Sequence, residues 1–281
     1  MSALQSTPGG DAFVRKLTTR MVEKVWGRDS LPAPFAAPPG KRIGEIWFEP
    51  PAELEQLLVK YLFTSEKLSV QVHPSVQNAQ GTEAGKEECW LVLDADPGAQ
   101  LAIGFDRAVS TQEVEQAAND GSIEQLLTWH DAHPGDVFYL PAGTVHAIGP
   151  GLSLVEVQQN SDTTFRLYDY GRPRELHLER ALDVADCGPY ARENRSAVKG
   201  GSEVLVAREH FRIDRIEGAS NYGSIMAGNS PSNGPLLLLP LSGQIRWGEH
   251  ESAAAGECVI ASALDLVNFT QADVTLVIAP A

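Results

Sequence analysis

One short stretch of this sequence, Leu68 to Pro74, carries side chains that can bind a metal ion. Alternation along a β-strand places Ser69, Gln71 and His73 on one face of that stretch. An amide oxygen and an imidazole nitrogen two residues apart can therefore reach the same small cation. Gln-x-His alone is weak evidence, because a single histidine more often packs or forms a hydrogen bond. The stretch needs further ligands from elsewhere in the chain.

Two later segments supply a carboxylate and a second imidazole. Glu88 stands in a Lys-x-Glu pattern with Lys86, and His146 ends a Gly-x5-Pro-x-Gly-x2-His pattern that begins at Gly135. The four candidate metal ligands are Gln71, His73, Glu88 and His146. One amide, two neutral imidazoles and one carboxylate leave a divalent ion with net positive charge. Such an ion is a strong Lewis acid, which can polarise a carbonyl or stabilise an oxyanion.

Short β-rich runs separated by turn residues must position these side chains. The runs are Ile43 to Phe48, Leu58 to Thr64, Leu68 to Val72, Cys89 to Leu93, Leu101 to Phe105, Val137 to Leu140 and Leu152 to Gln158. Many short strands at regular spacing are typical of an antiparallel sandwich or barrel. The sequence therefore predicts a mainly β fold.

Apolar residues at helical spacing interrupt this pattern in three places. Thr111 to Ala118 and Ser122 to Trp129 predict a small helical insertion at about residues 111–130. A third helix is expected over Leu178 to Ala185. These helices are few enough to leave the fold class unchanged.

Charged and small residues near Ala191 to Glu203 predict a linker. Beyond it β-like runs resume, and Gly256 to Ala263 is similar to Gly135 to Ala142 but is followed by no histidine. We therefore expect two domains. Residues 1–190 form a metal-binding catalytic domain, and residues 200–281 form a smaller, degenerate β domain without a metal site.

Composition restricts where the protein acts and what it binds. With 281 residues, 43% of them hydrophobic, and no run of eighteen apolar residues, the chain is expected to be globular and not to enter a membrane. A formal charge of −15 opposes binding to nucleic acid. Met1 to Asp11 has no apolar core of a signal peptide, so a cytoplasmic location is expected. The sequence makes no prediction of the oligomeric state.

Three motifs occur together in a characteristic order. Ser-x-Gln-x-His-Pro runs from Ser69 to Pro74, Lys-x-Glu is formed by Lys86 and Glu88, and Pro-Ala-Gly-x-x-His-Ala runs from Pro141 to Ala147. This combination resembles the cupin superfamily and, within it, the short bacterial form of the zinc-dependent type I mannose-6-phosphate isomerases. The resemblance runs from about Trp26 to Asp186. The C-terminal part resembles the family only loosely.

The resemblance implies a cupin-type jelly-roll barrel and one Zn2+ per chain. In that family the glutamine, the glutamate and the two histidines are the zinc ligands, which correspond here to Gln71, His73, Glu88 and His146. The identity of the metal follows only from the resemblance. A site with two nitrogen and two oxygen donors would also accept Mn2+, Fe2+ or Co2+.

The implied reaction interconverts mannose 6-phosphate and fructose 6-phosphate by moving a proton between adjacent carbons through an enediol. The family carries a Glu and an Asp-x-x-x-Arg after the second histidine, matched here by Glu156, Asp162 and Arg166, and its arginine is essential to catalysis. Either Glu156 or Asp162 could transfer the proton. Arg166 could stabilise the developing oxyanion or hold the phosphate.

Basic side chains near the motifs are the natural partners of a phosphate dianion in so acidic a chain. We expect Ser69, Lys86 and Arg172 to bind the phosphorylated hexose. The alternative is that Lys86 and Arg172 only balance nearby acids such as Glu87 and Glu175. His130 and His133 have a spacing that could bind metal, but a solvated surface role is expected for them.

Two other functions are compatible with the superfamily motifs. A metal-dependent oxygenase would more often carry a histidine-rich triad, so Gln71 counts against it. A sugar-binding module that has lost turnover would be expected to have lost Arg166 or Glu88, and both are present. Isomerisation of the phosphorylated sugar is therefore the preferred prediction.

Overall fold

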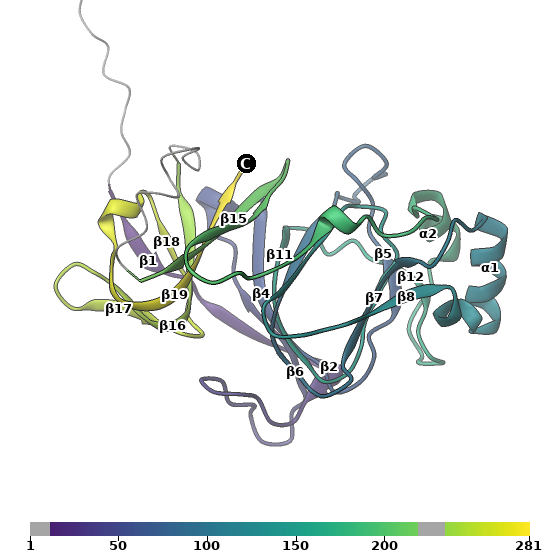
Figure 1. Cartoon of the computed structure of the whole chain (residues 1–281), viewed down its shortest axis with the longest axis horizontal. Coiled ribbons are helices and arrows are strands. Elements are labelled where there is room, and N and C mark those ends of the chain that lie inside the picture. The colour runs from purple at the N-terminus through teal and green to yellow at the C-terminus, as the bar shows by residue number, and fades with distance from the viewer. Residues whose placement is uncertain (1–11, 219–233) are drawn as a thin grey trace, which may run out of the picture.

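The computed structural model describes residues 12–218 and 234–281, and it is built mainly from β-strands in three sheets. The mainly β fold predicted from the sequence is confirmed. Figure 1 shows the three sheets as successive layers, with helices α1 and α2 beyond the last layer. The segment Met1 to Asp11, on which the expectation of no signal peptide rests, lies outside the described residues. No helix in the described ranges is long and apolar enough to cross a membrane.

The middle layer, which we call the central sheet, has seven strands in the order β13-β9-β6-β11-β4-β3-β2. They are β2 (Thr19–Arg28), β3 (Ile43–Phe48), β4 (Leu57–Phe63), β6 (Glu88–Ala95), β9 (Asp136–Leu140), β11 (Leu152–Gln159) and β13 (Arg195–Ala197). On one side lies the facing sheet, in the order β12-β5-β10-β7-β8. Its strands are β5 (Val70–Val72), β7 (Gln100–Phe105), β8 (Leu127–Asp131), β10 (His146–Ile148) and β12 (Phe165–Tyr168). Together these two sheets form the barrel.

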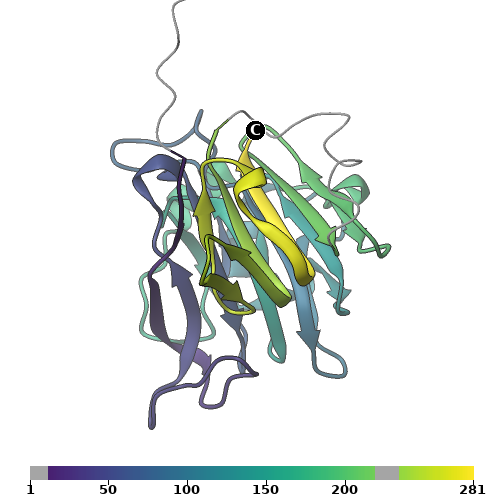
Figure 2. The same cartoon turned by 90° about the vertical axis from the view of Figure 1, so that its left-hand side faces the viewer.

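The third layer, which we call the outer sheet, covers the other side of the central sheet. Its order is β1-β18-β16-β19-β15-β14, with β17 paired to β16. The strands are β1 (Val14–Lys16), β14 (Glu203–Ala207), β15 (Phe211–Glu217), β16 (Leu236–Trp247), β17 (Glu251–Ala254), β18 (Val259–Ala261) and β19 (Asn268–Pro280). Figure 2 views this layer from its own side. The N-terminal strand β1 thus joins a sheet made otherwise of strands beyond residue 200.

Alternation along β6 explains why the strands of the central sheet read as continuous apolar runs. Cys89 and Leu91 pack in the core between the central and outer sheets. Trp90 and Val92 point to the other side and pack inside the barrel. A strand that is buried on both faces needs apolar residues at successive positions. A polar residue that interrupts such an apolar run therefore indicates a position with a role other than packing.

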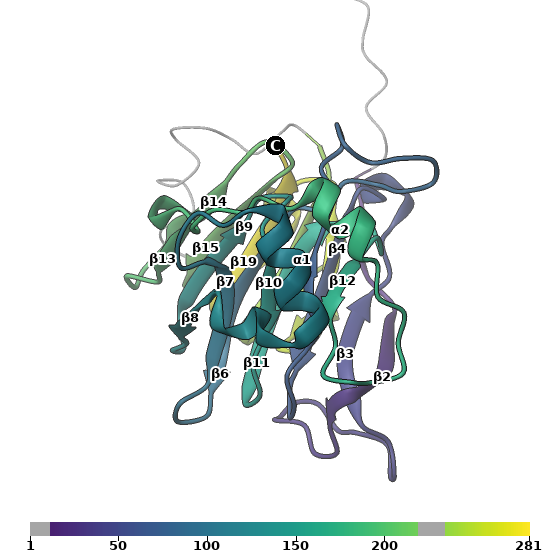
Figure 3. The same cartoon turned by 90° about the vertical axis from the view of Figure 1, so that its right-hand side faces the viewer.

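Helices α1 (Thr111–Asp120) and α2 (Leu178–Val184) cover the outside of the facing sheet, as Figure 3 shows. Their apolar residues join Val70 and Val72 of β5 in one core cluster. Ser110 caps α1 by accepting a hydrogen bond from the backbone N–H of Glu113 at 3.1 Å. The first and third expected helices therefore form close to where the apolar spacing predicted them.

The second expected helix, Ser122 to Trp129, is wrong beyond its first turn. A 3-10 helix covers Ser122–Gln125, and the chain then enters strand β8. β8 pairs with β7 and completes the edge of the facing sheet. The predicted linker also contains a strand, since β13 pairs with β9 of the central sheet. The division into two domains near residues 190–200 stays a prediction.

Candidate metal centre

Buried polar side chains line part of the barrel interior. They are Glu45, Lys60, Ser69, His73, Lys86, Glu88, His146 and Glu156. Burying charged groups is costly unless they pair with one another or hold an ion. This concentration inside an otherwise apolar barrel therefore marks a site and not a packing core.

Three of the predicted ligands converge on one point. One donor atom each from His73, Glu88 and His146 lies within 4.8 Å of the others. The Nε2 atoms of His73 and His146 lie 3.5 Å and 3.3 Å from the two carboxylate oxygens of Glu88. The side chains of all three are at most 2% exposed. Two imidazoles and one carboxylate so close together form a nitrogen and oxygen donor set suited to a divalent cation.

Gln71 lies against the same cluster because its strand pairs with that of His146. The two residues are direct register partners of β5 and β10, and Gln71 Nε2 lies 3.3 Å from His146 Nε2. The amide oxygen of Gln71 accepts a hydrogen bond from Ser69 Oγ at 3.0 Å. A half-turn of the amide exchanges its oxygen and nitrogen and would direct the oxygen to the cluster. The structure thus brings the four predicted ligands and Ser69 together.

Backbone carbonyls orient both imidazoles. His73 Nδ1 lies 2.8 Å from the carbonyl oxygen of Thr163, and His146 Nδ1 lies 2.8 Å from that of Thr144. A carbonyl oxygen can only accept, so each Nδ1 carries the proton and donates. Each Nε2 then presents a lone pair to the cluster, as a metal-ligating histidine requires.

Burial sets the charge of these groups. It lowers the pKa of His73 well below the ordinary value of 6.5, and the charge of Lys86 lowers it further. Burial also lowers the pKa of His146, although Glu88 opposes this shift. For Glu88, burial raises the pKa, but Lys86 and His146 outweigh it and leave the pKa below its ordinary value. At neutral pH the cluster therefore has two neutral imidazoles and one carboxylate, which are the forms that bind metal.

The surroundings of Glu88 also fit a cation. Its Oε2 lies 2.5 Å from the ammonium of Lys86, which in turn lies 3.0 Å from His73 Nε2. Its Oε1 is buried and forms no hydrogen bond with any residue that the structure describes. A buried carboxylate oxygen without a partner is destabilising, and a bound cation would supply the missing interaction. The residues present therefore fit a divalent metal ion.

A small cavity of about 90 Å³ opens beside the cluster. Glu156 lines it, ion-paired with Lys60 at 2.8 Å and accepting a hydrogen bond from Trp90 Nε1 at 3.1 Å. Burial lowers the pKa of Lys60, but the carboxylates of Glu156 and Glu45 outweigh it and hold the pKa above its ordinary value. Lys60 therefore remains charged inside the barrel.

Two arginines reach the same cavity. Arg166 is half-buried, and its Nε is buried without a hydrogen-bond partner among the described residues. Burial lowers the pKa of Arg166, and the charge of Arg174 lowers it further. Arg174 is held by the buried carboxylate of Asp169 through hydrogen bonds of 2.5 and 2.6 Å. Both guanidinium groups thus add positive charge beside the candidate ligands.

Two predicted site residues lie elsewhere. Asp162 is exposed and lines a separate cavity with Arg20 and Trp47. Arg172 binds Asp169 at 3.2 Å and the carbonyl oxygen of Lys67 at 2.8 Å, and it does not line the 90 Å³ cavity. The structure therefore brings Glu156, Arg166 and Lys86 to the candidate ligands, but not Asp162 or Arg172.

The sequence analysis missed Lys60, Glu45 and Arg174. Lys60 interrupts the otherwise apolar run Leu57–Phe63, and Glu45 interrupts Ile43–Phe48 in the same way. A charged residue in the middle of a strand that is buried on both faces is a signal that could have been used. For Arg174 the local sequence carries no comparable signal.

No family model matches the chain. A mannose-6-phosphate isomerase from Streptococcus mutans is 45% identical over 140 residues, which cover 47% of this chain and 44% of that protein. The mannose-6-phosphate isomerase ManA of Bacillus subtilis is 43% identical over 139 residues, 46% of this chain and 44% of the relative. The matched region therefore spans less than half the length of either curated relative.

Solved structures match over nearly the whole chain. The mannose 6-phosphate isomerase of Bacillus subtilis superposes with a TM-score of 0.74 at 25% identity, covering 94% of this chain and 98% of that structure. A zinc-bound mannose 6-phosphate isomerase shares the fold with a TM-score of 0.71 at 15% identity, covering 95% of this chain and 99% of that structure. By sequence over less than half of the chain, and by fold over nearly all of it, the chain is similar to mannose-6-phosphate isomerases, the family that its motifs resemble.

Proposed function

We propose that this protein interconverts mannose 6-phosphate and fructose 6-phosphate by metal-assisted proton transfer through an enediol. The observation that carries the proposal is the convergence of His73, Glu88 and His146 within 4.8 Å, in a barrel whose relatives are named for this activity. A cluster of nitrogen and oxygen donors beside a carboxylate and several basic groups suits a reaction of a phosphorylated sugar.

Zn2+ is the metal that we propose, held by Gln71, His73, Glu88 and His146. When bound, it would polarise the oxygens on the two reacting carbons of the sugar and so stabilise the charge that develops there. The support from the structure is the buried, neutral state of both imidazoles and the partnerless oxygen of Glu88. A zinc-bound isomerase among the structural relatives supports the choice of metal.

We assign the proton transfer between the two carbons to Glu156. It lines the cavity beside the ligands, whereas Asp162 is exposed and lines another cavity. The hydrogen bond from Trp90 and the ion pair with Lys60 fix the orientation of the Glu156 carboxylate. A general base must lie within hydrogen-bond reach of the proton that it removes, so a fixed carboxylate at the cavity wall is the better candidate.

Positive charge around the cavity supports a role in binding the phosphate and in stabilising the oxyanion. Arg166 has a buried Nε without a partner among the described residues, so it can still donate to a substrate oxygen. Arg174 is already bonded to Asp169 and contributes mainly charge. We propose that Lys86 and Ser69 contact the substrate as well, and that Arg172 acts indirectly by binding the same Asp169 as Arg174.

Two alternatives remain as outcomes of the test. An oxygenase or a sugar-binding module could use the same barrel. The carboxylate and the basic groups beside the candidate ligands favour isomerisation of a phosphorylated sugar over both. The cytoplasmic location also stays a prediction.

A coupled assay of purified protein would test the proposal. We expect turnover of mannose 6-phosphate to fructose 6-phosphate without O2, loss of turnover after chelation, and recovery when Zn2+ is added back. Binding of the sugar without turnover would favour a binding module, and a requirement for O2 would favour an oxygenase. Turnover unaffected by complete removal of metal would contradict the proposed centre.

A further inference from the structure

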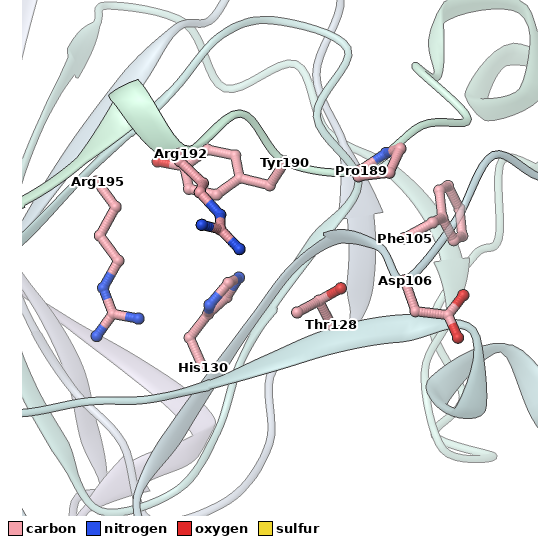
Figure 4. A pocket seen from close by; sticks show the side chains of 8 residues that line it. All are labelled: Phe105, Asp106, Thr128, His130, Pro189, Tyr190, Arg192 and Arg195. Atoms are coloured by element: carbon pink, nitrogen blue, oxygen red, sulfur yellow. The ribbon is translucent and has the colours of Figure 1, made fainter.

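A second and larger cavity, of about 530 Å³, lies at the edge of the barrel away from the metal centre. Figure 4 shows its lining, which comes from the end of β7 with the following Asp106, from β8 and from the segment at residues 189–195. None of its lining residues borders the 90 Å³ cavity beside the candidate ligands. Its size is typical of a site for a small organic molecule.

Basic groups gather at one end of this cavity. The side chains of His130, Arg192 and Arg195 lie there, and Figure 4 shows the Arg192 guanidinium facing the His130 ring. Asp106, the acidic residue in the lining, lies at the other end with its carboxylate turned away from them. Two guanidinium groups so placed in a chain of charge −15 create a local attraction for an anion.

The three groups differ in how far they are already engaged. Arg195 is ion-paired with Asp136 at 3.1 Å and stacks over the ring of Phe138. Burial lowers the pKa of His130, and the charge of Arg195 lowers it further, so His130 contributes a polar contact and not a charge at neutral pH. The guanidinium of Arg192 forms no hydrogen bond or ion pair with any residue in ranges 12–218 and 234–281. Arg192 is thus the group with donors to offer a ligand.

Besides Asp106 and Thr128, the rest of the lining consists of two aromatic rings and a proline. The hydroxyl of Tyr190 lies 2.7 Å from the carbonyl oxygen of Tyr139 and 2.8 Å from that of Asn194, and its single proton can be donated to either, so its ring is held in place. Phe105 and Pro189 lie toward the other end, and Thr128 lies between the two ends in Figure 4. A rigid aromatic and aliphatic wall favours a flat apolar group beside the anion.

We infer that this cavity binds a small organic anion, a carboxylate or phosphate monoester attached to a flat ring. The charged group binds the guanidinium of Arg192, whose planar fork matches the oxygens of either anion. The ring lies along Tyr190 and over Thr128 toward Pro189. The cavity shares no lining residue with the one beside the candidate ligands, and no candidate ligand lines it, so binding does not require the metal.

Calorimetric titration with phenyl phosphate, benzoate and inorganic phosphate tests this inference. We expect one molecule of phenyl phosphate or benzoate per chain, bound more tightly than inorganic phosphate and equally well with or without chelator. Arg192→Ala should weaken binding by about tenfold, because it removes charged hydrogen bonds. The matched control is Arg246→Ala, which removes an exposed arginine of the outer sheet that has no side-chain partner in the described structure.

Each outcome decides the inference. Preference for benzoate or for phenyl phosphate identifies which anion the site takes. No binding by the parent, or equal binding by the Arg192→Ala and Arg246→Ala variants, overturns the site. Inorganic phosphate bound as tightly as phenyl phosphate overturns the assignment of an organic anion. Loss of binding on chelation places the probe at the metal centre and also overturns it. These readouts do not depend on isomerase activity.

Discussion

The two sides of the central sheet are filled in opposite ways. On the barrel side, Glu88 and Glu156 project into a space that also holds buried lysines and histidines. On the other side, Leu237, Leu239 and Ile260 of the outer sheet join an apolar core. Among the described residues of the outer sheet's strands, Asp214 and Thr275 are the buried polar ones.

Apolar burial stabilises a fold by about 25 cal/mol per Å², whereas a buried charge costs several kcal/mol unless it is paired. The outer sheet therefore contributes stability directly. The polar part of the barrel stabilises the fold only through its internal ion pairs and through whatever ion it holds. The buried charges on the barrel side therefore indicate selection for function, and the apolar core on the other side indicates selection for stability.

Substitution of the candidate metal ligands should have the largest effect on the polar side of the central sheet. The double variant Gln71→Ala/His146→Ala should lose both bound zinc and all measurable turnover, because two of four donors disappear. Metal analysis of the purified protein should find close to one equivalent of zinc in the parent and little in the variant. His250→Ala, which removes an exposed histidine after β16, should keep its metal. Equal zinc in the parent and the double variant would mean that the ligands are misassigned.

The carboxylate beside the ligands comes next in expected effect. Glu156→Gln should lower kcat by about 10²–10⁴-fold while leaving zinc content unchanged, since a general base typically contributes that much. Asp162→Asn is the matched control, and its kcat should stay near that of the parent, because Asp162 is exposed and apart from the cavity. The reverse ranking of the two variants would exchange their roles.

Stability variants sharpen the contrast between the two faces. Lys60→Met should destabilise by about 3–5 kcal/mol, because it leaves Glu156 buried without its ion pair. Leu239→Ala should cost a similar amount, about 2–5 kcal/mol, by leaving a cavity in the outer core. Chemical denaturation measures both losses.

Combining the change at Lys60 with one at its partner separates stability from function. Lys60→Met/Glu156→Leu should regain most of the lost stability and remain inactive, because no unpaired charge is left and the base is gone. Leu239→Ala should keep the parent's kcat per folded molecule. If the double variant were as unstable as Lys60→Met alone, the ion pair would not be the cause.

Acid should affect the metal-free barrel. Burial lowers the pKa values of His73 and His146 below 6.5, so as pH falls through that value these side chains take up protons in the unfolded chain before they do so in the folded one. Stability is then complete above pH 6.5 and decreases below it, by about 1.4 kcal/mol per pH unit for each histidine at most.

Thermal unfolding of chelated protein at pH 7 and pH 5.5 measures this effect. The parent should lose more stability between the two values than His146→Leu, which lacks one of the two buried imidazoles. Glu88 affects stability at lower pH than the histidines do. Its pKa is lowered in the folded protein, so its contribution to stability is lost only as the pH falls through that lowered pKa. An identical pH dependence in the two proteins would contradict the burial argument.

The smallest expected effect comes from a substitution in neither core of the central sheet, at the start of helix α1. Ser110→Ala removes the N-cap of α1 and should lower stability by about 1 kcal/mol. Zinc content and kcat should not change, because α1 packs on the outside of the facing sheet, in an apolar cluster that includes none of the candidate ligands. Differential scanning calorimetry, with a metal assay in parallel, checks both statements.

Several parts of this arrangement could be predicted from the sequence. Period-2 patterns and turn residues located strands such as Ile43–Phe48 almost to the residue. The candidate ligands could be chosen because three spaced motifs occur in order, and alternation alone put Gln71 and His73 on one face. Each of these features could be predicted because a pattern within a short stretch of sequence specifies it.

Other parts depend on contacts between distant segments. The run that ends at Trp129 has apolar residues at helical spacing, yet pairing with β7 makes its second half a strand. The role of Lys60 depends on the register that places it opposite Glu156 in the central sheet, which no local pattern specifies. Asp162 and Glu156 could not be distinguished from the sequence, because they differ in their burial and in the cavities that they line.

The strand order of the outer sheet has a consequence for synthesis. β19 (Asn268–Pro280) lies between β16 and β15 in the sheet but follows both in the sequence. The ribosome therefore synthesises this inner strand after its two neighbours. Until β19 emerges, the outer sheet can form only as two separate pieces. The apolar face of the central sheet that packs against the outer sheet is then incompletely covered. A chain stalled before residue 268 should therefore be a target for chaperones that bind exposed apolar surface.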